Sequence, residues 1–286
     1  MIIETDKYSG FCFGVNKAIN KVEELLSDNP GLVCLGEIVH NHEEVERLSS
    51  LGMKTVDLKE IPTIHHNTVL IRTHGEPPST YQKLKTNNNR IIDATCPVVL
   101  KLQERIRKSY LNCKGTPCQL AIFGKKNHPE VIGLNGQVDN QAIVVTTPYD
   151  LSLIDFTRPI ELYSQTTMSF DDFISISEII KERAKNEVVI HDTICRQVAN
   201  RIPRLAAFSK QFDIILFVSG KNSSNGKQLF ETCLKNNPRS YFISAPGEIQ
   251  KNWFSNCESI GISGATSTPR WLLEKVKSHV STILNV

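Results

Sequence analysis

The chain has 286 residues, with 33 Lys and Arg against 30 Asp and Glu, so its formal net charge is only +3. This balance excludes a protein whose whole surface is directed at a polyanion, and we expect no nucleic-acid partner. With 40% hydrophobic and 22% charged residues the composition is that of a globular chain, and the length allows two or three domains.

Membrane and secretory segments are not expected. No apolar run reaches the roughly 18 residues of a transmembrane helix. The first residues, Met1-Ile-Ile-Glu-Thr-Asp-Lys7, carry acids where a secretory signal has a basic region and an apolar stretch. We therefore expect a cytoplasmic chain, where thiols stay reduced. Its eight cysteines are then buried hydrophobes, catalytic thiols or metal ligands rather than a disulfide framework.

Short apolar runs alternate with longer amphipathic segments along the whole chain. Strands are predicted at 31–35, 68–72, 90–93, 119–123, 142–145, 161–163, 188–192, 213–218, 240–243 and 259–263. Helices are predicted between them at 14–27, 43–51, 79–86, 98–110, 129–135, 170–186, 197–209, 226–235 and 268–280. Short, continuously apolar strands are typical of parallel sheets buried on both faces. The alternation predicts an α/β architecture.

A weak internal repeat divides the chain into three parts. Cys12, Cys96 and Cys195 each stand at the entrance to a predicted helix. Strand ends marked by Gly36, Gly124 and Gly220 follow them after 24, 28 and 25 residues. We therefore predict three small α/β domains with pseudo-threefold symmetry, at residues 1–95, 96–193 and 194–267. On spacing alone, any α/β chain with glycines at its strand ends is an equal alternative.

The three repeated cysteines are candidate metal ligands. In open α/β sheets the loops beyond the carboxyl ends of the strands meet at one site. Three thiolates there suit an iron–sulfur cluster whose fourth iron stays open. The alternative for any single cysteine is a buried small hydrophobe, which we prefer for Cys34 and Cys233. Three more show no partner motif, and the absence of C-x-x-C argues against a zinc ribbon or thioredoxin-like site: Cys113, Cys118 and Cys257.

A polar segment after an apolar strand predicts an anion site. Lys221-Asn-Ser-Ser-Asn225-Gly opens a helix, where backbone N–H groups and the side chains of Ser223, Ser224 and Asn225 can hold a phosphate. It lacks the P-loop spacing, so no nucleoside triphosphate site is indicated. Its alternative is an ordinary capping turn. Three residues at other strand ends can complete the same pocket, although a lone histidine is more often structural: His40, His74 and Ser267.

The motif His128-Pro-Glu130 pairs an imidazole with a carboxylate, and we predict that both groups are catalytic, with Glu130 as the acid. A carboxyl group in a partly dry pocket has a raised pKa, which suits it to deliver protons. Thr166 and Thr167 can hold a hydroxyl group or water beside it. The alternative is a helix start with Pro in its first position and Glu in its first turn.

Nine motifs in order resemble those of the 4-hydroxy-3-methylbut-2-enyl diphosphate reductase family, and they extend from residue 10 to residue 271. They are Gly10-Phe-Cys12-Phe-Gly-Val, Gly36-Glu-Ile-Val-His40-Asn, Arg72-Thr-His74-Gly75, Asp93-Ala-Thr-Cys96-Pro-Val, His128-Pro-Glu130-Val, Gln165-Thr166-Thr167, Thr193-Ile-Cys195, Gly220-Lys-Asn-Ser-Ser-Asn225 and Ser267-Thr-Pro. One such motif is weak evidence. Nine in register are specific.

The resemblance implies the last step of the methylerythritol phosphate pathway, in which an allylic hydroxy diphosphate is reductively dehydroxylated to isopentenyl and dimethylallyl diphosphate. It implies three α/β domains around a [4Fe–4S] cluster with one open iron, and a C-terminal segment, residues 268–286, that returns to the first domain. A ferredoxin or flavodoxin is the implied electron donor. The implied roles are cluster ligation by Cys12, Cys96 and Cys195, proton delivery by Glu130, contact with the substrate hydroxyl by Thr166, and diphosphate binding by His40, His74, His128, Ser223, Ser224, Asn225 and Ser267.

Departures from the family pattern occur around Asn127, Gln197 and Thr266. They change the local loops without removing a proposed ligand or acid. Two other classes of function remain open at this stage. One is a non-redox diphosphate-binding protein whose cysteines are structural or bind zinc. The other is a transferase or hydrolase with a cysteine nucleophile and a histidine.

Overall fold

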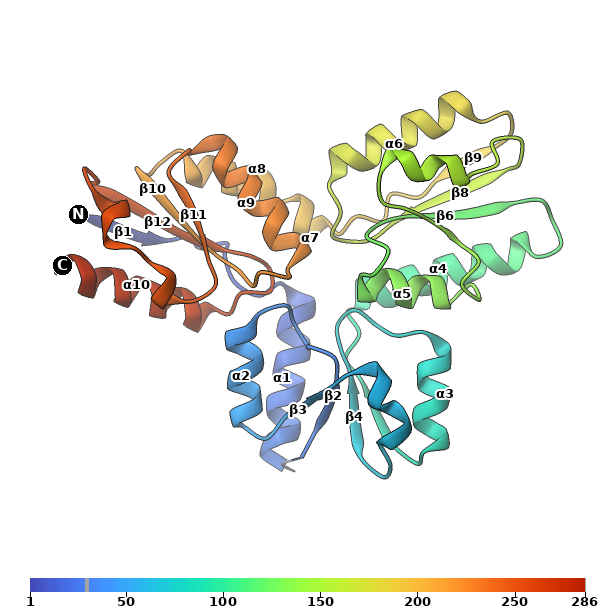
Figure 1. Cartoon of the computed structure of the whole chain (residues 1–286), viewed down its shortest axis with the longest axis horizontal. Helices are drawn as coiled ribbons and strands as arrows, with labels where there is room; N and C mark the ends of the chain where they lie inside the picture. Colours follow the sequence, from blue (N-terminus) through green and yellow to red (C-terminus); the bar gives the residue numbers. More distant parts are fainter. Residues whose placement is uncertain (29–30, 286) are drawn as a thin grey trace. The chain divides into compact units, whose positions relative to one another are not determined.

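The computed structural model describes residues 1–28 and 31–285, and it contains three parallel sheets of four strands each (Figure 1). The chain divides into two compact units. Unit 1 comprises Met1–Pro30, Glu37–Met53 and Arg196–Val286, and unit 2 comprises Gly31–Gly36 and Lys54–Cys195. The predicted α/β class with parallel sheets is confirmed.

Unit 1 contains one sheet. Its order is β1 (Ile2–Thr5), β12 (Ser259–Gly264), β10 (Ile214–Val218) and β11 (Ser240–Ile243), with all neighbours parallel. The N-terminal strand thus lies beside a strand that is more than 250 residues later in the chain.

Unit 2 contains the other two sheets. One has the order β3 (Lys54–Val56), β2 (Val33–Leu35), β4 (Thr68–Ile71) and β5 (Arg90–Asp93). The second has the order β7 (Ile143–Val145), β6 (Gln119–Phe123), β8 (Ile160–Ser164) and β9 (Val188–Ile190).

The three sheets share one topology, which supports the repeat inferred from the cysteines. In both sheets of unit 2 the strand that comes second in the chain lies at one edge. The first, third and fourth strands follow in that order across the sheet. The sheet of unit 1 has the same order if β1 takes the place of the fourth strand. The third repeat is therefore completed by the start of the chain. The proposed domain boundaries at 95, 193 and 267 stay a prediction.

All ten predicted strands are present, and two further strands, β1 and β3, were not predicted. Ile2 at the start of β1 is 62% exposed, and β3 carries the sequence Lys-Thr-Val with only Val56 buried. Neither segment is a continuous apolar run, because both strands lie at sheet edges where fewer side chains are covered.

The helices follow the predicted segments closely. They are α1 (Phe13–Asp28), α2 (His42–Ser50), α3 (Pro78–Thr86), α4 (Pro97–Cys113), α5 (Pro129–Gly136), α6 (Phe170–Arg183), α7 (Arg196–Ala199), α8 (Arg201–Ser209), α9 (Ser224–Asn236) and α10 (Arg270–Leu284). Short 3₁₀ segments lie at Leu58–Thr63, Pro148–Leu153, Pro246–Glu248 and Lys251–Phe254. The helix predicted at 197–209 is divided at Asn200 into α7 and α8.

Both faces of the unit 1 sheet are covered, as its apolar strands require. Alternate residues of β10 point to opposite faces. Ile214 and Leu216 belong to a core with Leu272 and Val276 of α10. Phe217, on the other face, belongs to a core that α8 and α9 complete. The predicted return of residues 268–286 to the first domain stays a prediction; α10 packs on the sheet that contains β1.

No helix in the described part of the chain is long and apolar enough to cross a membrane. Two cysteines differ from the expectation of reduced thiols, because Cys113 and Cys118 form a disulfide. The short turn between α4 and β6 brings their Cα atoms to 5.4 Å. Sequence spacing alone did not reveal this pairing.

Candidate active site

The three predicted cluster cysteines occupy equivalent places in the three sheets. Cys12 directly precedes α1, Cys96 is the N-cap of α4, and Cys195 directly precedes α7. Their backbone N–H groups donate to carbonyl oxygens, from Cys12 to Thr266 (3.1 Å), from Cys96 to Thr73 (3.0 Å) and from Cys195 to Thr166 (2.9 Å).

These acceptors are themselves equivalent. Thr266, Thr73 and Thr166 each lie two residues beyond the end of a strand, namely β12, β4 and β8. In every sheet that strand pairs with the edge strand that leads to the cysteine. The same backbone hydrogen bond therefore positions each of the three thiols at the carboxyl end of its own sheet, where ligands of parallel sheets bind.

Exposure separates these three cysteines from the buried ones. Cys12, Cys96 and Cys195 form no disulfide and are partly exposed. Cys34 and Cys233 are fully buried, and desolvation raises the pKa of each thiol to about 12. Only thiolates ligate metals. Cys34 and Cys233 therefore remain protonated packing residues.

The predicted acid, Glu130, is 1% exposed in the first turn of α5. Its carboxylate accepts the backbone N–H of Thr166 at 2.6 Å and the Thr166 hydroxyl at 2.8 Å. Burial raises the pKa of Glu130 to about 7, although both hydrogen bonds from Thr166 oppose the rise. A carboxyl group with this pKa can hold and release a proton near neutral pH.

Two predicted histidines lie together in unit 2. His128 is the N-cap of α5 and its Nδ1 accepts the N–H of Glu130 at 3.2 Å. The rings of His74 and His128 make an edge-to-face contact with centroids 5.3 Å apart. The loop of His74 approaches α5 closely because Gly133 faces the carbonyl of Gly75 with no side chain between them. Unit 2 thus places two imidazoles beside the buried acid.

The residues of the predicted anion cradle lie at the start of α9 in unit 1. Ser223 caps the helix by accepting the N–H of Gly226 at 3.0 Å, and its Oγ lies 3.3 Å from Oγ of Ser267. Asn225 is 5% exposed, and its Oδ1 accepts the N–H and the hydroxyl of Thr266 at 3.2 and 2.8 Å. Its buried Nδ2 has no hydrogen-bond acceptor in the described protein. Such a donor suits an anionic ligand.

His40 reaches the same end of unit 1. Its Nδ1 lies 3.3 Å from Oε2 of Glu37. A Cβ atom on Gly220 would overlap the carbonyl oxygen of His40. Only glycine permits this approach between the strand end of β10 and the His40 loop. Both residues line an open pocket of about 400 Å³ together with Lys221.

Three residues that support the site were not predicted. Gln165 is fully buried; its Oε1 accepts the N–H of Lys125 at 3.1 Å, and its Nε2 donates to Oγ1 of Thr167 at 2.7 Å. The guanidinium of Arg201, 7% exposed, donates to the carbonyls of Gly264 (2.5 Å) and Gly10 (3.5 Å). Thr266 orients Asn225, as described above. These roles are visible only from contacts in the folded structure, because Gln, Arg and Thr are ordinary residues at strand and helix ends.

The chain is similar over nearly its full length to known proteins. The family model described as "LytB protein" matches residues 3–281. The 4-hydroxy-3-methylbut-2-enyl diphosphate reductase of Phocaeicola vulgatus is 50% identical, covering 97% of this chain and 98% of that protein. The reductase of Bacteroides thetaiotaomicron, with the same name, is 49% identical over 99% of this chain and 98% of that protein.

Solved structures are similar as well. A structure of (E)-4-hydroxy-3-methyl-but-2-enyl diphosphate reductase, described as the terminal enzyme of the non-mevalonate pathway, has a TM-score of 0.73 and 33% identity, covering 99% of this chain and all of that one. A reductase from Plasmodium falciparum has a TM-score of 0.87 and 25% identity, covering 98% of this chain and 88% of that one.

Proposed function

We propose, since the chain belongs to the LytB protein family, that it reduces 4-hydroxy-3-methylbut-2-enyl diphosphate to isopentenyl and dimethylallyl diphosphate. Near-complete coverage by relatives that are named as this reductase supports the reductase over a non-redox diphosphate-binding protein. The reaction consumes two electrons and two protons, and the allylic hydroxyl group leaves as water.

The observation that carries this proposal is the pair formed by Glu130 and Thr166. A leaving hydroxyl group needs a proton, and Glu130 holds one near neutral pH because its pKa is raised to about 7. The Thr166 hydroxyl donates to the Glu130 carboxylate at 2.8 Å, and its oxygen can accept a hydrogen bond from the substrate hydroxyl. The Thr166 carbonyl accepts the N–H of Cys195 (2.9 Å), so one residue links the acid to a proposed ligand.

We further propose that Cys12, Cys96 and Cys195 hold a [4Fe–4S] cluster. The donor set fits, because all three form no disulfide, are partly exposed and stand at helix starts, where thiolates are stabilised. When bound, such a cluster supplies one-electron transfer, and an iron without a protein ligand supplies a Lewis acid for a hydroxyl oxygen.

We assign the diphosphate to the polar donors predicted from the sequence, namely His40, His74, His128, Ser223, Ser224, Asn225 and Ser267. The open donor Nδ2 of Asn225 and the N-terminus of α9 are suited to phosphate oxygens. Binding energy from this remote group positions the reacting carbon.

A cluster accepts single electrons, so we propose a ferredoxin or flavodoxin as the electron donor. We also propose the cytoplasm as the compartment. The test is anaerobic expression with iron, followed by turnover with a reduced one-electron dye. We expect about four irons and four sulfides per chain and both isomeric products. A colourless, iron-free chain without turnover would overturn the proposal, and bound zinc in its place would favour the non-redox alternative.

A further inference from the structure

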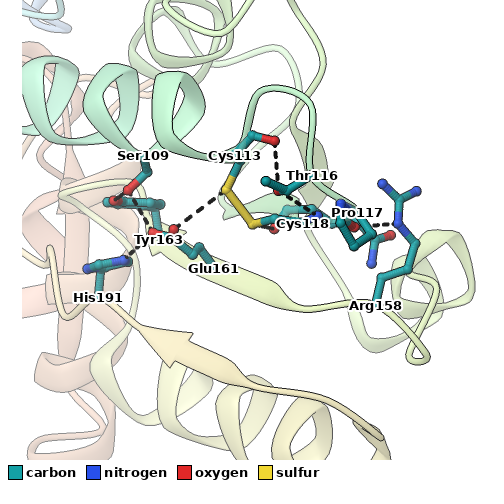
Figure 2. The surroundings of a disulfide bond; sticks show 10 residues. Ser109, Cys113, Thr116, Pro117, Cys118, Arg158, Glu161, Tyr163 and His191 are labelled. Atoms are coloured by element: carbon teal, nitrogen blue, oxygen red, sulfur yellow. Dashed lines mark hydrogen bonds and ion pairs between the residues drawn. A yellow bond between two sulfur atoms is a disulfide. The ribbon is translucent and has the colours of Figure 1, made fainter.

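The disulfide between Cys113 and Cys118 contains no residue assigned to the reductase. Cys113 is the last residue of α4 and Cys118 directly precedes β6 (Figure 2). Both line an open pocket of about 610 Å³, so solvent, small thiols and metal ions can reach the sulfur atoms.

A carboxylate faces this pair of sulfur atoms. Oε1 of Glu161 in β8 lies 3.7 Å from Sγ of Cys113. One ligand atom from each of Cys113, Cys118 and Glu161 lies within 4.8 Å of the other two. A tetrahedral Zn²⁺ with bonds of about 2.3 Å to sulfur and about 2.0 Å to oxygen places these ligand atoms about 3.5 Å apart. The 3.7 Å between Oε1 of Glu161 and Sγ of Cys113 is close to this value, and the two sulfur atoms reach it once the disulfide is reduced.

Two neighbouring side chains fix the position of the second oxygen of Glu161. Oε2 accepts the hydroxyl of Ser109 at 2.6 Å and lies 2.8 Å from Nε2 of His191 (Figure 2). The His191 ring stacks on Tyr163 with centroids 4.1 Å apart, and the Tyr163 hydroxyl lies 2.7 Å from Oγ of Ser109. Metal-binding carboxylates are typically oriented by hydrogen bonds of this kind. The arrangement leaves Oε1 directed at the cysteines.

The turn that connects the two cysteines contains a glycine in the left-handed region. Gly115 has φ +84°, and nothing lies within 4 Å of the Cβ position that a larger residue would occupy there. The four residues between the cysteines correspond to the C-x₂₋₄-C spacing of structural zinc sites.

We propose that Cys113, Cys118 and Glu161 form a zinc site that alternates with the disulfide. In the reduced chain two thiolates and one carboxylate bind Zn²⁺, and water from the pocket takes the fourth position. In the oxidised chain a low-molecular-weight disulfide accepts two electrons from the two thiolates. The Cys113–Cys118 bond then forms, Zn²⁺ leaves, and two protons complete two small thiols. A dithiol reductant reverses the step.

The test uses the anaerobic, cluster-loaded full chain, so that the three proposed cluster cysteines are occupied. The protein is reduced with dithiothreitol, desalted, incubated with Zn²⁺ and passed over a chelating resin, and zinc per chain is measured by mass spectrometry. We expect one zinc more in wild type than in Cys118→Ser. Glu161→Gln should weaken zinc binding at least tenfold in competition with a chromophoric chelator. Cys257→Ser, a thiol in unit 1 that contacts the carbonyl of Ser259, should keep the zinc of wild type.

Glutathione disulfide should release one zinc per chain from wild type and form two glutathione thiols. Turnover of Cys118→Ser and of Glu161→Gln should stay within twofold of wild type. Equal zinc contents in wild type and Cys118→Ser would overturn the site. Unchanged affinity in Glu161→Gln would remove Glu161 as a ligand, and this variant decides the matter if Cys118→Ser does not fold. The zinc content and the release of glutathione thiols do not depend on the reductase activity, so failure of one proposal leaves the other standing.

Discussion

Thr166 donates two hydrogen bonds to the buried carboxylate of Glu130, one to each oxygen. The backbone N–H of Thr166 donates at 2.6 Å and its hydroxyl donates at 2.8 Å. The hydroxyl is the part of Thr166 that a side-chain substitution can remove. Thr166→Val keeps the shape and the backbone bond. We expect its turnover to fall about 10²-fold, because acid–base catalysis depends on a correctly held proton donor.

Thr166→Ser keeps the hydroxyl and is the matched control for this change. We expect its turnover within about fivefold of wild type, since only a methyl group is lost. The measurement is steady-state product formation by the anaerobic holoenzyme with a reduced one-electron dye. Equal turnover in the Val and Ser variants would show that the hydroxyl has no part in the reaction.

The raised pKa of Glu130 predicts a pH-dependent stability. In the unfolded chain this carboxyl titrates near its ordinary value of 4.5, whereas in the folded protein it titrates at about 7. Between these pH values the folded state keeps a proton that the unfolded state has lost, so stability falls as the pH rises. The penalty is complete above pH 7 and amounts to about 3 kcal/mol.

Glu130→Gln removes this penalty. The thermal midpoint of the variant, relative to wild type, should therefore rise between pH 5 and pH 7 and then remain constant. Glu178→Gln changes an exposed carboxylate of α6 and should follow the wild-type curve. Parallel curves for wild type and Glu130→Gln would contradict the assigned pKa.

Turnover of Glu130→Gln should collapse while iron content and diphosphate binding persist.

The fold class and the repeated cysteines could be predicted from the sequence because both depend on local patterns. Buried parallel strands are apolar runs, and a cysteine before an amphipathic segment is visible without a structure. The partner of β1 was not visible, because β1 pairs with a strand more than 250 residues away. The same holds for Asn225 and Thr266, and for Gln165 and Lys125, whose hydrogen bonds join separate strand ends. Such contacts arise from topology and not from local composition.

The unpartnered Nδ2 of Asn225 predicts a specific loss of diphosphate affinity. Asn225→Asp keeps an acceptor for Thr266 but replaces the donor with a negative charge, so we expect at least a 100-fold weaker Kd for inorganic pyrophosphate. Asn225→Ala should weaken it about tenfold, since a hydrogen bond to a charged group contributes about 1.5–3 kcal/mol. Calorimetry on the holoenzyme measures both. Asn236→Ala, at the other end of α9, should bind as wild type does, and an Asp variant that also does so would remove Asn225 from the cradle.

The assignment of the cysteines predicts opposite results for two Cys→Ser variants in unit 2. Cys195→Ser removes a proposed ligand and should lose most of the iron, sulfide and turnover together. Cys34→Ser replaces a thiol whose pKa burial raises to about 12 and should retain all three. Iron and sulfide analysis with visible absorbance checks the pair. Full cluster content in Cys195→Ser would exclude that cysteine as a ligand.

The contact between Gly220 and His40 predicts that one added methyl group disturbs the cradle. A Cβ atom at Gly220 would overlap the backbone carbonyl of His40, and a backbone cannot rotate away as a side chain can. Gly220→Ala should therefore lower stability by about 1–3 kcal/mol and weaken pyrophosphate binding at least tenfold. Gly247→Ala is the matched control, because nothing lies within 4 Å of its Cβ position. Denaturant unfolding and calorimetry of the two variants measure both effects. If Gly220→Ala binds pyrophosphate like Gly247→Ala, close approach of the His40 loop is not required for the diphosphate site.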